Sequence, residues 1–243
     1  MLNRTSTPST AGFASAPEHR MREAEEIEPV FSIQQDPFNA LISSNIRIAK
    51  GATLFRESQK FEFLYAIRSG SFKTTMLIED GREQVTGFHM AGDILGLDGI
   101  GECAYTCGAV ALENAEVSVL PLRQYVRLSH GNASMHEHLY KIMSREIARD
   151  HNMMLLLGTM RAEERVAAFL LNLSERYTAG GYSSREFNLR MTREEIGSYL
   201  GLKLETVSRM FSKFHHDGLV NIRQKNIRIL STDKLRQVIG NCN

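Results

Sequence analysis

The sequence predicts an α+β fold in which a β domain, a long helix and a small helical domain follow one another. Short apolar runs separated by glycines occupy residues 46–122, helical periodicity follows over Ser134–Leu157, and two short helices flank a tight turn within Thr192–Phe214. With 243 residues, of which 42% are hydrophobic and 23% charged, the chain is long enough for two globular domains.

Residues 1–30 are rich in Ser, Thr, Ala and Pro and then in charged residues, which predicts a flexible N-terminal arm. They lack the apolar stretch of a secretory signal. The longest strongly apolar run, Met153–Leu157, is too short to span a membrane. The three cysteines form no even framework, which suits a reducing environment. We therefore expect a cytoplasmic protein without membrane contact.

Residues 31–133 are predicted to form the β domain, a compact sandwich or barrel. Apolar runs such as Phe63–Ile67 and Val117–Leu120 are typical of buried strands. Asp80-Gly81 is a favourable dipeptide for a hairpin turn.

Residues 134–160 are predicted to form a dimerisation helix. Its seam repeats with the spacing 3, 4, 3, 4, 3, which is a heptad pattern, at Tyr140, Met143, Ile147, Asp150, Met154 and Leu157. The alternative is a helix that packs this face on its own β domain. Asp150 favours the dimer, because an acid is harder to explain in a strip that meets only the β domain. Across a two-fold axis, the two Asp150 carboxylates would repel and weaken the dimer.

Residues 161–243 are predicted to form the C-terminal domain. A helix over Ala162–Tyr177 ends at Gly180-Gly181. This part holds 14 Lys and Arg against 9 Asp and Glu, whereas residues 1–160 hold 15 against 19. The basic half of the chain is where a polyanion would bind.

Thr192 and Glu195 have the spacing of a capping box, and Gly201 permits a tight turn between two helices. The second helix, about Leu204–His216, divides into two faces. A buried stripe is predicted at Val207, Met210, Phe211 and Phe214, and a polar patch at Glu205, Ser208 and Arg209. The alternative is a surface helix with one Glu–Arg ion pair. The preceding helix and glycine turn favour a helix-turn-helix that reads DNA.

Each polar side chain has chemistry suited to a base. The Arg209 fork fits guanine O6 and N7, Glu205 suits cytosine N4, and Ser208 suits a base edge or the backbone. Alternation over Leu219–Ile222 and Ile227–Leu230 around Lys225-Asn226 predicts a hairpin, the wing of a winged helix-turn-helix. Contacts to DNA phosphates are predicted for Lys203, Thr206, Lys213, Arg223, Lys225 and Arg228.

Five segments make the chain resemble the Fnr-type branch of the Crp/Fnr family of bacterial transcription regulators. They are LYAIRSG (64–70), TGFHMAGD (86–93), AEERVAAF (162–169), REFNLRMTREEIGSYLGL (185–202) and ETVSR (205–209). The resemblance, which covers residues 31 to 240, implies a cyclic-nucleotide-binding-like β-roll, a dimerisation helix and a winged helix-turn-helix. It implies a homodimer that binds double-stranded DNA at TTGAT-N4-ATCAA and reads it with Glu205, Ser208 and Arg209.

The resemblance also implies an activator of anaerobic, redox or nitrogen-oxide-related genes that contacts RNA polymerase. The contacting surfaces would be the Glu79–Gln84 turn, with Asp80, Gly81 and Arg82, and the Tyr182–Arg185 loop, with Ser183 and Ser184. The alternative for both segments is an ordinary polar loop.

The sensing end departs from the family's best-known patterns. Between Asp93 and Leu122 there is no Lys, Arg or His to neutralise a cyclic nucleotide phosphate, so cyclic AMP is not expected. An iron–sulfur cluster commonly needs four thiolates, whereas residues 1–102 hold no cysteine and Ser118 stands at the fourth ligand position that the resemblance implies. No cluster and no other metal site is therefore expected.

Three alternatives remain for the signal. Cys103 and Cys107 could form a thiol switch or a partial metal site, or they could be small residues of a glycine-rich loop. Haem or nitric oxide sensing would need an axial ligand such as His89 or a histidine near the dimerisation helix, although a lone histidine more often serves packing or solvation. The third alternative is regulation without a ligand. An enzyme of the cupin type, which needs clustered ligands, is disfavoured because His89 is the only histidine in residues 46–122.

Overall fold

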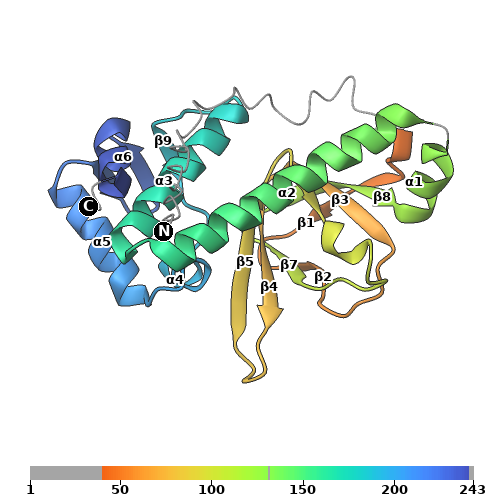
Figure 1. Cartoon of the computed structure of the whole chain (residues 1–243), viewed down its shortest axis with the longest axis horizontal. Coiled ribbons are helices and arrows are strands. Elements are labelled where there is room, and N and C mark those ends of the chain that lie inside the picture. The colour runs from red at the N-terminus through yellow and green to blue at the C-terminus, as the bar shows by residue number, and fades with distance from the viewer. Residues whose placement is uncertain (1–39, 131, 241–243) are drawn as a thin grey trace, which may run out of the picture.

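A computed structural model describes residues 40–130 and 132–240 (Figure 1). The predicted arm over residues 1–30 and the third cysteine, Cys242, lie outside the described residues. The β domain and the helical domain lie at opposite ends of the molecule, and the long helix α2 crosses from one to the other. The α+β class and the predicted order of β domain, long helix and helix-turn-helix are confirmed.

The β domain consists of two four-stranded antiparallel sheets, ordered β1-β8-β3-β6 and β2-β7-β4-β5. Its strands are β1 Ser44–Ile48, β2 Thr53–Phe55, β3 Phe63–Ser69, β4 Ser71–Leu77, β5 Glu83–Met90, β6 Ile94–Leu95, β7 Gly108–Ala111 and β8 Ala115–Pro121. Side chains of both sheets meet in one core, where the Phe55 and Tyr105 rings stack with centroids 4.0 Å apart. Met135, Leu139 and Ile142 of α2 join this core, so the β domain and the start of the long helix are one packed unit.

The β4–β5 hairpin projects beyond the rest of the β domain (Figure 1). Gly81 takes a positive φ of 84°, and its N–H donates to the Ile78 carbonyl at 2.8 Å. Glycine enters this left-handed region without steric cost, which confirms the predicted turn at Asp80-Gly81. Asp80 and Arg82 form an exposed ion pair at the tip, 2.6 Å apart.

The helices are α1 Leu122–Ser129, α2 Ala133–Thr159, α3 Ala162–Ala179, α4 Arg193–Leu200, α5 Leu204–His216 and α6 Thr232–Gly240, together with a short 3-10 helix at Leu97–Gly99. The predicted helices over Ser134–Leu157 and Ala162–Tyr177 are confirmed, each slightly longer than expected. Helices α1 and α6 were not predicted. Pro121 precedes α1 without a cap hydrogen bond, so no capping residue marked its start. Ser231 does cap α6, with its Oγ accepting from the Lys234 N–H at 3.3 Å, but no capping box like that of α4 accompanies it.

A second core lies in the helical domain and extends into the β domain. Val85, Phe88 and Leu112 come from strand β5 and the end of β7, yet they are buried against α3 and α4. Phe88 contacts the rings of Phe169 and Tyr199 at centroid distances of 6.1 and 5.1 Å. Among the residues described, no helix has both the length and the apolar content to cross a bilayer.

Candidate nucleic-acid interface

Helix α4 begins with the predicted capping box. The Glu195 N–H donates to Thr192 Oγ1 at 3.1 Å, and the Thr192 N–H donates to Glu195 Oε2 at 2.7 Å. The helix ends at Gly201, which has a φ of 63°. A Cβ at Gly197 would lie 2.6 Å from the Leu202 carbonyl oxygen. Glycine is therefore required at position 197 of α4, because the chain that leads into α5 passes close to it. These local features fix the angle between α4 and α5.

Helix α5 has the two faces that its sequence predicts. Val207, Phe211 and Phe214 are fully buried, and Met210 is partly buried against the same core. The Arg193 guanidinium of α4 lies 3.5 Å from the centre of the Phe211 ring, a cation–π contact that joins the two helices. The buried face therefore holds α5 in a fixed orientation.

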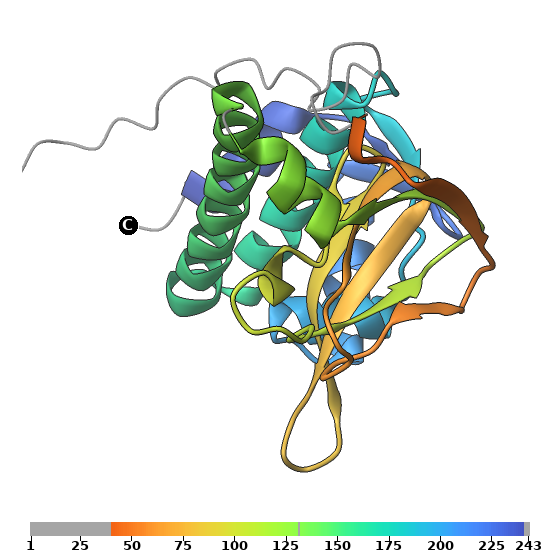
Figure 2. The ribbon, with the colours of Figure 1, turned by 90° about the vertical axis from the view of Figure 1, so that its right-hand side faces the viewer.

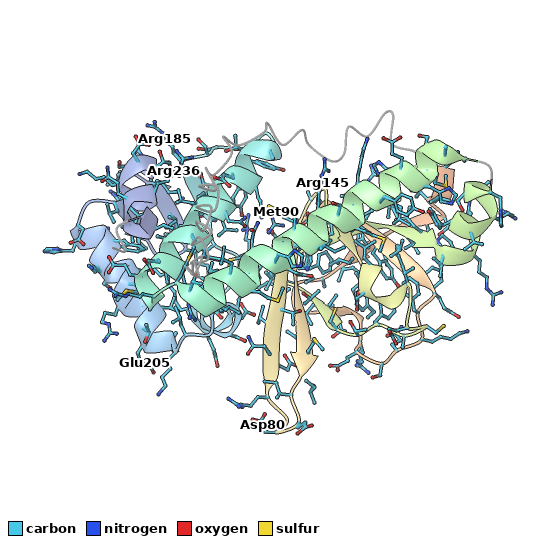
Figure 3. All side chains as sticks on the ribbon, viewed as in Figure 1. Asp80, Met90, Arg145, Arg185, Glu205 and Arg236 are labelled. Carbon is cyan, nitrogen blue, oxygen red and sulfur yellow. The ribbon has the colours of Figure 1, made fainter. Side chains whose placement is uncertain are left out.

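Glu205, Ser208 and Arg209 are all exposed on the opposite face of α5. Glu205 lies at the lower edge of the helical domain in the view of Figure 3. Among the described residues, no hydrogen bond or ion pair joins Glu205 or Arg209 to another side chain, so the alternative of an intrahelical Glu–Arg pair is not what the structure shows. The outward groups are available to a partner.

The wing is a three-stranded sheet rather than a hairpin alone, with the order β10-β11-β9. Its strands are β9 Glu186–Asn188, β10 Val220–Arg223 and β11 Asn226–Ile229. The predicted turn at Lys225-Asn226 was wrong by one residue, because Asn226 pairs with Arg223 and the turn is Gln224-Lys225. Gln224 takes a positive φ of 56° in this turn. Strand β9 was not predicted.

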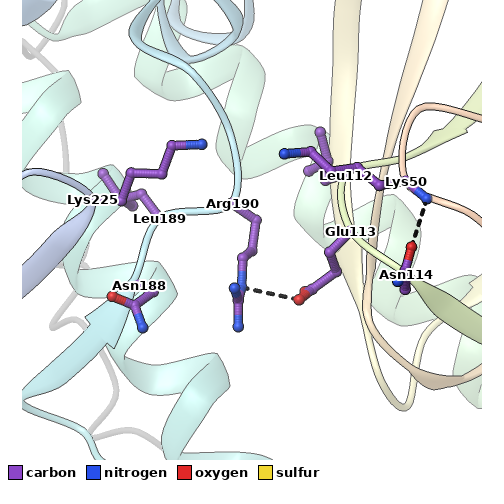
Figure 4. A pocket seen from close by; sticks show the side chains of 8 residues that line it. All are labelled: Lys50, Leu112, Glu113, Asn114, Asn188, Leu189, Arg190 and Lys225. Carbon is purple, nitrogen blue, oxygen red and sulfur yellow. Dashed lines mark hydrogen bonds and ion pairs between the residues drawn. The ribbon is translucent and has the colours of Figure 1, made fainter.

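The predicted phosphate-contacting residues differ in their surroundings. Lys203, Arg223 and Arg228 are exposed and Thr206 is half-buried. Lys213 forms an ion pair with Glu163 of α3 at 2.6 Å, and would have to leave it to reach DNA. Lys225 lines a pocket between the two domains (Figure 4). Their contact with phosphate stays a prediction.

Arg165 of α3 joins the long helix to the helix-turn-helix. Its guanidinium donates to the carbonyls of Leu157 at 2.7 Å and of Leu200 at 3.0 Å, and its Nε donates to the Met160 carbonyl at 2.9 Å. These carbonyls lie at the C-terminal ends of α2 and α4, where partial negative charge gathers and intrahelical donors are lacking. One side chain therefore ties the end of α2 to the turn that precedes α5.

A partly buried group of charged side chains, here called the Asp93 cluster, links three elements. Asp93 follows β5, Glu146 and Arg149 belong to α2, and Arg176 belongs to α3. The Asp93 carboxylate lies 2.5 Å from Arg176 Nη2 and 3.3 Å from Arg149 Nη2, and Glu146 lies 3.0 Å from Arg149. Burial alone would raise the pKa of Asp93, but the two guanidinium groups outweigh burial and hold that pKa below its ordinary value.

Further contacts join α4 directly to the β4–β5 hairpin. Lys73 of β4 pairs with Glu195 at 2.9 Å. The Val85 N–H donates to Ser198 Oγ at 2.9 Å, and the Gln84 side-chain amide donates to the Ser198 carbonyl. Together with the Asp93 cluster, these contacts set the position of the helix-turn-helix relative to the β domain. They join residues far apart in the chain, so sequence spacing gave no indication of them.

The predicted seam of α2 lies on the outer side of the helix. Tyr140, Ile147 and Met154 are 66%, 52% and 61% exposed, and Asp150 is exposed beside them. Met143 is the exception and packs partly on the β domain core. Figure 2 shows α2 along one side of the molecule with the β domain against its inner face. The helix packs on its own chain through a different face, so the seam is left without a partner in the protomer.

Sequence comparison matches the two halves of the chain to known domains. Residues 45–132 match the cyclic nucleotide-binding domain, and residues 164–238 match the Crp-like helix-turn-helix domain. The transcriptional regulatory protein btr of Bordetella pertussis is 47% identical over 205 residues, which cover 84% of this chain and 85% of that protein. The chain belongs to the Crp/Fnr family.

Two other relatives support the same family assignment. The fumarate and nitrate reduction regulatory protein of Escherichia coli is 42% identical over 84% of this chain and 82% of its own length. The solved structure of FixK2 from Bradyrhizobium japonicum superposes with a TM-score of 0.77 at 27% identity and covers 84% of this chain and all of that one. The protein is thus a DNA-binding transcription regulator and not an enzyme.

The β-roll of this Crp/Fnr regulator has an acid, Asp98, within the segment between Asp93 and Leu122 that lacks a cation for a cyclic nucleotide phosphate. The Asp98 carboxylate accepts hydrogen bonds from the Thr106 N–H at 2.8 Å, from the Thr106 hydroxyl at 2.7 Å and from the Cys107 N–H at 3.2 Å. These donors would otherwise be free for an anionic ligand. The carboxylate would also repel a phosphate placed there.

Cys107 of the roll lies in surroundings that disfavour a thiolate. Cys107 is buried with its Sγ 3.5 Å from Asp98, and burial together with this carboxylate raises the pKa of the thiol. A thiol in these surroundings stays protonated and reacts slowly. Cys103 is exposed and has a positive φ of 58°. A thiol switch at this pair stays an untested prediction that the geometry of Cys107 does not favour.

His89 lies against Thr74, with its Nε2 3.2 Å from the Thr74 hydroxyl oxygen, while its buried Nδ1 has no hydrogen-bond partner in the described chain. Burial lowers the pKa of His89 to about 4, so the ring is neutral at physiological pH. Ser118, at the expected fourth cluster position, is buried and donates to Asn45 at 2.7 Å. Within residues 40–130 and 132–240, no three His, Cys, Asp or Glu side chains gather as metal ligands.

Proposed function

We propose that the protein acts in the cytoplasm as a homodimer on a TTGAT-N4-ATCAA-like palindrome. The observation that carries this proposal is the exposed patch of Glu205, Ser208 and Arg209, which has no side-chain partner in the described part of the chain and lies on a helix whose other face is buried. The forked guanidinium of Arg209 suits a guanine, and Glu205 suits the amino group of a cytosine. A Crp-like helix-turn-helix domain supports this use of the helix.

The dimer would form along the outer face of α2. An exposed row of large apolar side chains, Tyr140, Ile147 and Met154, is unusual on a monomer and typical of a coiled-coil seam. A symmetric dimer places two recognition helices in inverted orientation, as an inverted repeat requires.

The first prediction concerns sequence specificity. The full-length protein should bind a duplex with TTGAT-N4-ATCAA at least about 1,000-fold more tightly than a scrambled duplex. This is the lower end of the ratio between specific and non-specific affinity that is typical of sequence-specific DNA-binding proteins. Fluorescence anisotropy at fixed salt measures both affinities, since the phosphate contribution depends on salt. Equal affinity for the two duplexes would refute the proposed site.

The second prediction concerns Asp150. Two carboxylates facing each other across the seam would repel, so Asp150→Ala should strengthen the dimer. Sedimentation equilibrium should show a lower dissociation constant, with the difference shrinking at high salt because salt screens exposed charges. Asp233→Ala, which removes an exposed acid of α6, is the matched control and should change nothing. An unchanged monomer–dimer equilibrium in Asp150→Ala would contradict the assignment.

We further propose that the protein activates transcription of anaerobic, redox or nitrogen-oxide-related genes through contact with RNA polymerase. Two exposed surfaces would serve, the hairpin tip with Asp80, Gly81 and Arg82 and the loop with Ser183 and Ser184. Figure 3 places Asp80 at the hairpin tip and Arg185 on the other side of the molecule. Two separate contacts would therefore be needed.

The residues present do not fit an iron–sulfur cluster, which commonly needs four thiolates. The hydroxyl of Ser118 is engaged with Asn45, and a hydroxyl is a poor substitute for a thiolate. We propose a regulator that carries neither a cluster nor cyclic AMP. Haem remains open as an alternative, with His89 as the candidate ligand because its Nδ1 lacks a partner.

A further inference from the structure

A pocket of about 400 Å³ lies between the β domain and the helical domain (Figure 4). The β domain contributes Lys50, from the turn after β1, and Glu113 and Asn114, from the turn between β7 and β8. The helical domain contributes Asn188, the last residue of β9, Arg190, which follows that strand, and Lys225, from the wing turn. Leu112 and Leu189 form an apolar part of the lining. The volume falls within the usual range of small-molecule sites.

The charges of this pocket are not balanced. Arg190 pairs with Glu113 at 3.1 Å, and Glu113 also accepts a hydrogen bond from Ser71 at 2.9 Å. Lys50 and Lys225 have no acidic partner within ion-pair distance among the residues described. Figure 4 shows their side chains extending toward one another across the pocket above Arg190. Two ammonium groups that face each other repel unless an anion lies between them.

We propose that this interdomain pocket binds a small polyanion, a compact molecule with at least two phosphate or carboxylate groups. Lys50 and Lys225 would contact it from the two sides, and Arg190 would offer its planar fork, which matches both oxyanions. The side-chain amides of Asn114 and Asn188 offer further donors. The pocket is distinct from the β-roll interior and from the exposed face of α5.

A ligand held there would bear on the position of the helix-turn-helix. Arg190 lies two residues before Thr192, the cap of α4, and its only ion pair in the described chain is the one to Glu113 of the β domain. An incoming anion competes with Glu113 for Arg190 and at the same time bridges Lys50 to Lys225. Binding would therefore exchange one interdomain contact for another, which is how a ligand shifts a domain arrangement.

The test is isothermal titration calorimetry of the full-length protein with inorganic pyrophosphate and, in a second arm, with citrate. The two arms separate a phosphate ligand from a carboxylate ligand. The double variant Lys50→Ala/Lys225→Ala should weaken binding at least tenfold, whereas Lys234→Ala, which removes an exposed lysine of α6, should leave it unchanged. Both lysines of the pocket are exposed, so circular dichroism should show the same fold in every variant.

Glu113→Gln provides a variant with the opposite expected sign. It removes the charge that competes for Arg190 while its amide oxygen still accepts the Ser71 hydroxyl, so pyrophosphate or citrate should bind several-fold more tightly. Absence of binding by both anions, or equal affinity in the double variant, would overturn the proposal. A second result would also overturn it: duplex DNA displaces the small anion, and Lys50→Ala and Lys225→Ala weaken duplex binding equally. That result would show that the two lysines contact the DNA backbone instead. Because the titration needs no DNA, its failure leaves the proposed palindrome untouched.

Discussion

Replacing Arg209 with alanine is expected to weaken binding to the palindrome by about 1–3 kcal/mol at each half-site, or about 5- to 150-fold per half-site. The guanidinium is exposed on α5 and has no partner among residues 40–130 and 132–240, so its loss should remove the proposed base contact without disturbing the fold. Fluorescence anisotropy with the palindromic duplex measures the loss. Unchanged thermal unfolding confirms that the domain is intact.

The matched control is Arg236→Ala on α6. Arg236 is exposed, has its one ion pair among the described residues with Asp233 at 3.8 Å, and lies away from Glu205 in Figure 3. Arg236→Ala removes the same positive charge as Arg209→Ala, so any difference between the two variants comes from the position of the arginine rather than from net charge. A second duplex with the half-site guanine replaced makes the test sharper: wild type should lose affinity for it, and Arg209→Ala should not. Equal discrimination by both proteins would show that Arg209 does not contact that base.

Asp93→Ala is expected to reduce the free energy of unfolding by about 3–5 kcal/mol, the range for removing one partner of a buried ion pair. The Asp93 side chain is 14% exposed, and its loss leaves Arg176 without its carboxylate partner and Arg149 with Glu146 alone. Urea denaturation followed by circular dichroism measures the change. Asp80→Ala is the control: it breaks an ion pair of similar length at the exposed hairpin tip and should have no measurable effect.

The same carboxylate predicts the acid dependence of stability. The folded-state pKa of Asp93 lies below its ordinary value of 3.8, so its stabilising effect is complete above that value and is lost as the pH falls through the folded pKa. The unfolding free energies of wild type and Asp93→Asn should therefore differ at pH 6 and converge as the pH is lowered below 3.8. A constant difference down to pH 2 would contradict the cluster's role.

The helix-turn-helix was predictable because its determinants are local. Thr192 and Glu195 form the capping box three residues apart, Gly201 ends the helix, and the apolar stripe of α5 follows from one heptad of sequence. The Asp93 cluster was not predictable, since Asp93 is separated from Arg149 by 56 residues and from Arg176 by 83. No periodicity relates such positions, and their proximity follows only from the packing of α2 and α3 on the β domain.

The turn of the wing and strand β9 show a second limit to what can be predicted from the sequence. Asparagine is the usual residue for a left-handed turn position, yet Gln224 takes it because the pairing of Arg223 with Asn226 places the turn one residue earlier. Strand β9 has three residues, of which Phe187 alone is buried, and it forms only by pairing with β11. Tertiary pairing decides both features.

The second core, with Val85, Phe88 and Leu112 of the β domain packed against α3 and α4, has a consequence for cooperativity. A fragment beginning at Arg161 would leave the facing surfaces of Phe169 and Tyr199 in water, since their contact with Phe88 would be gone. The border between the two functional halves of the chain is thus not a border between folding units. We therefore expect the β domain and the helical domain to unfold in one cooperative transition.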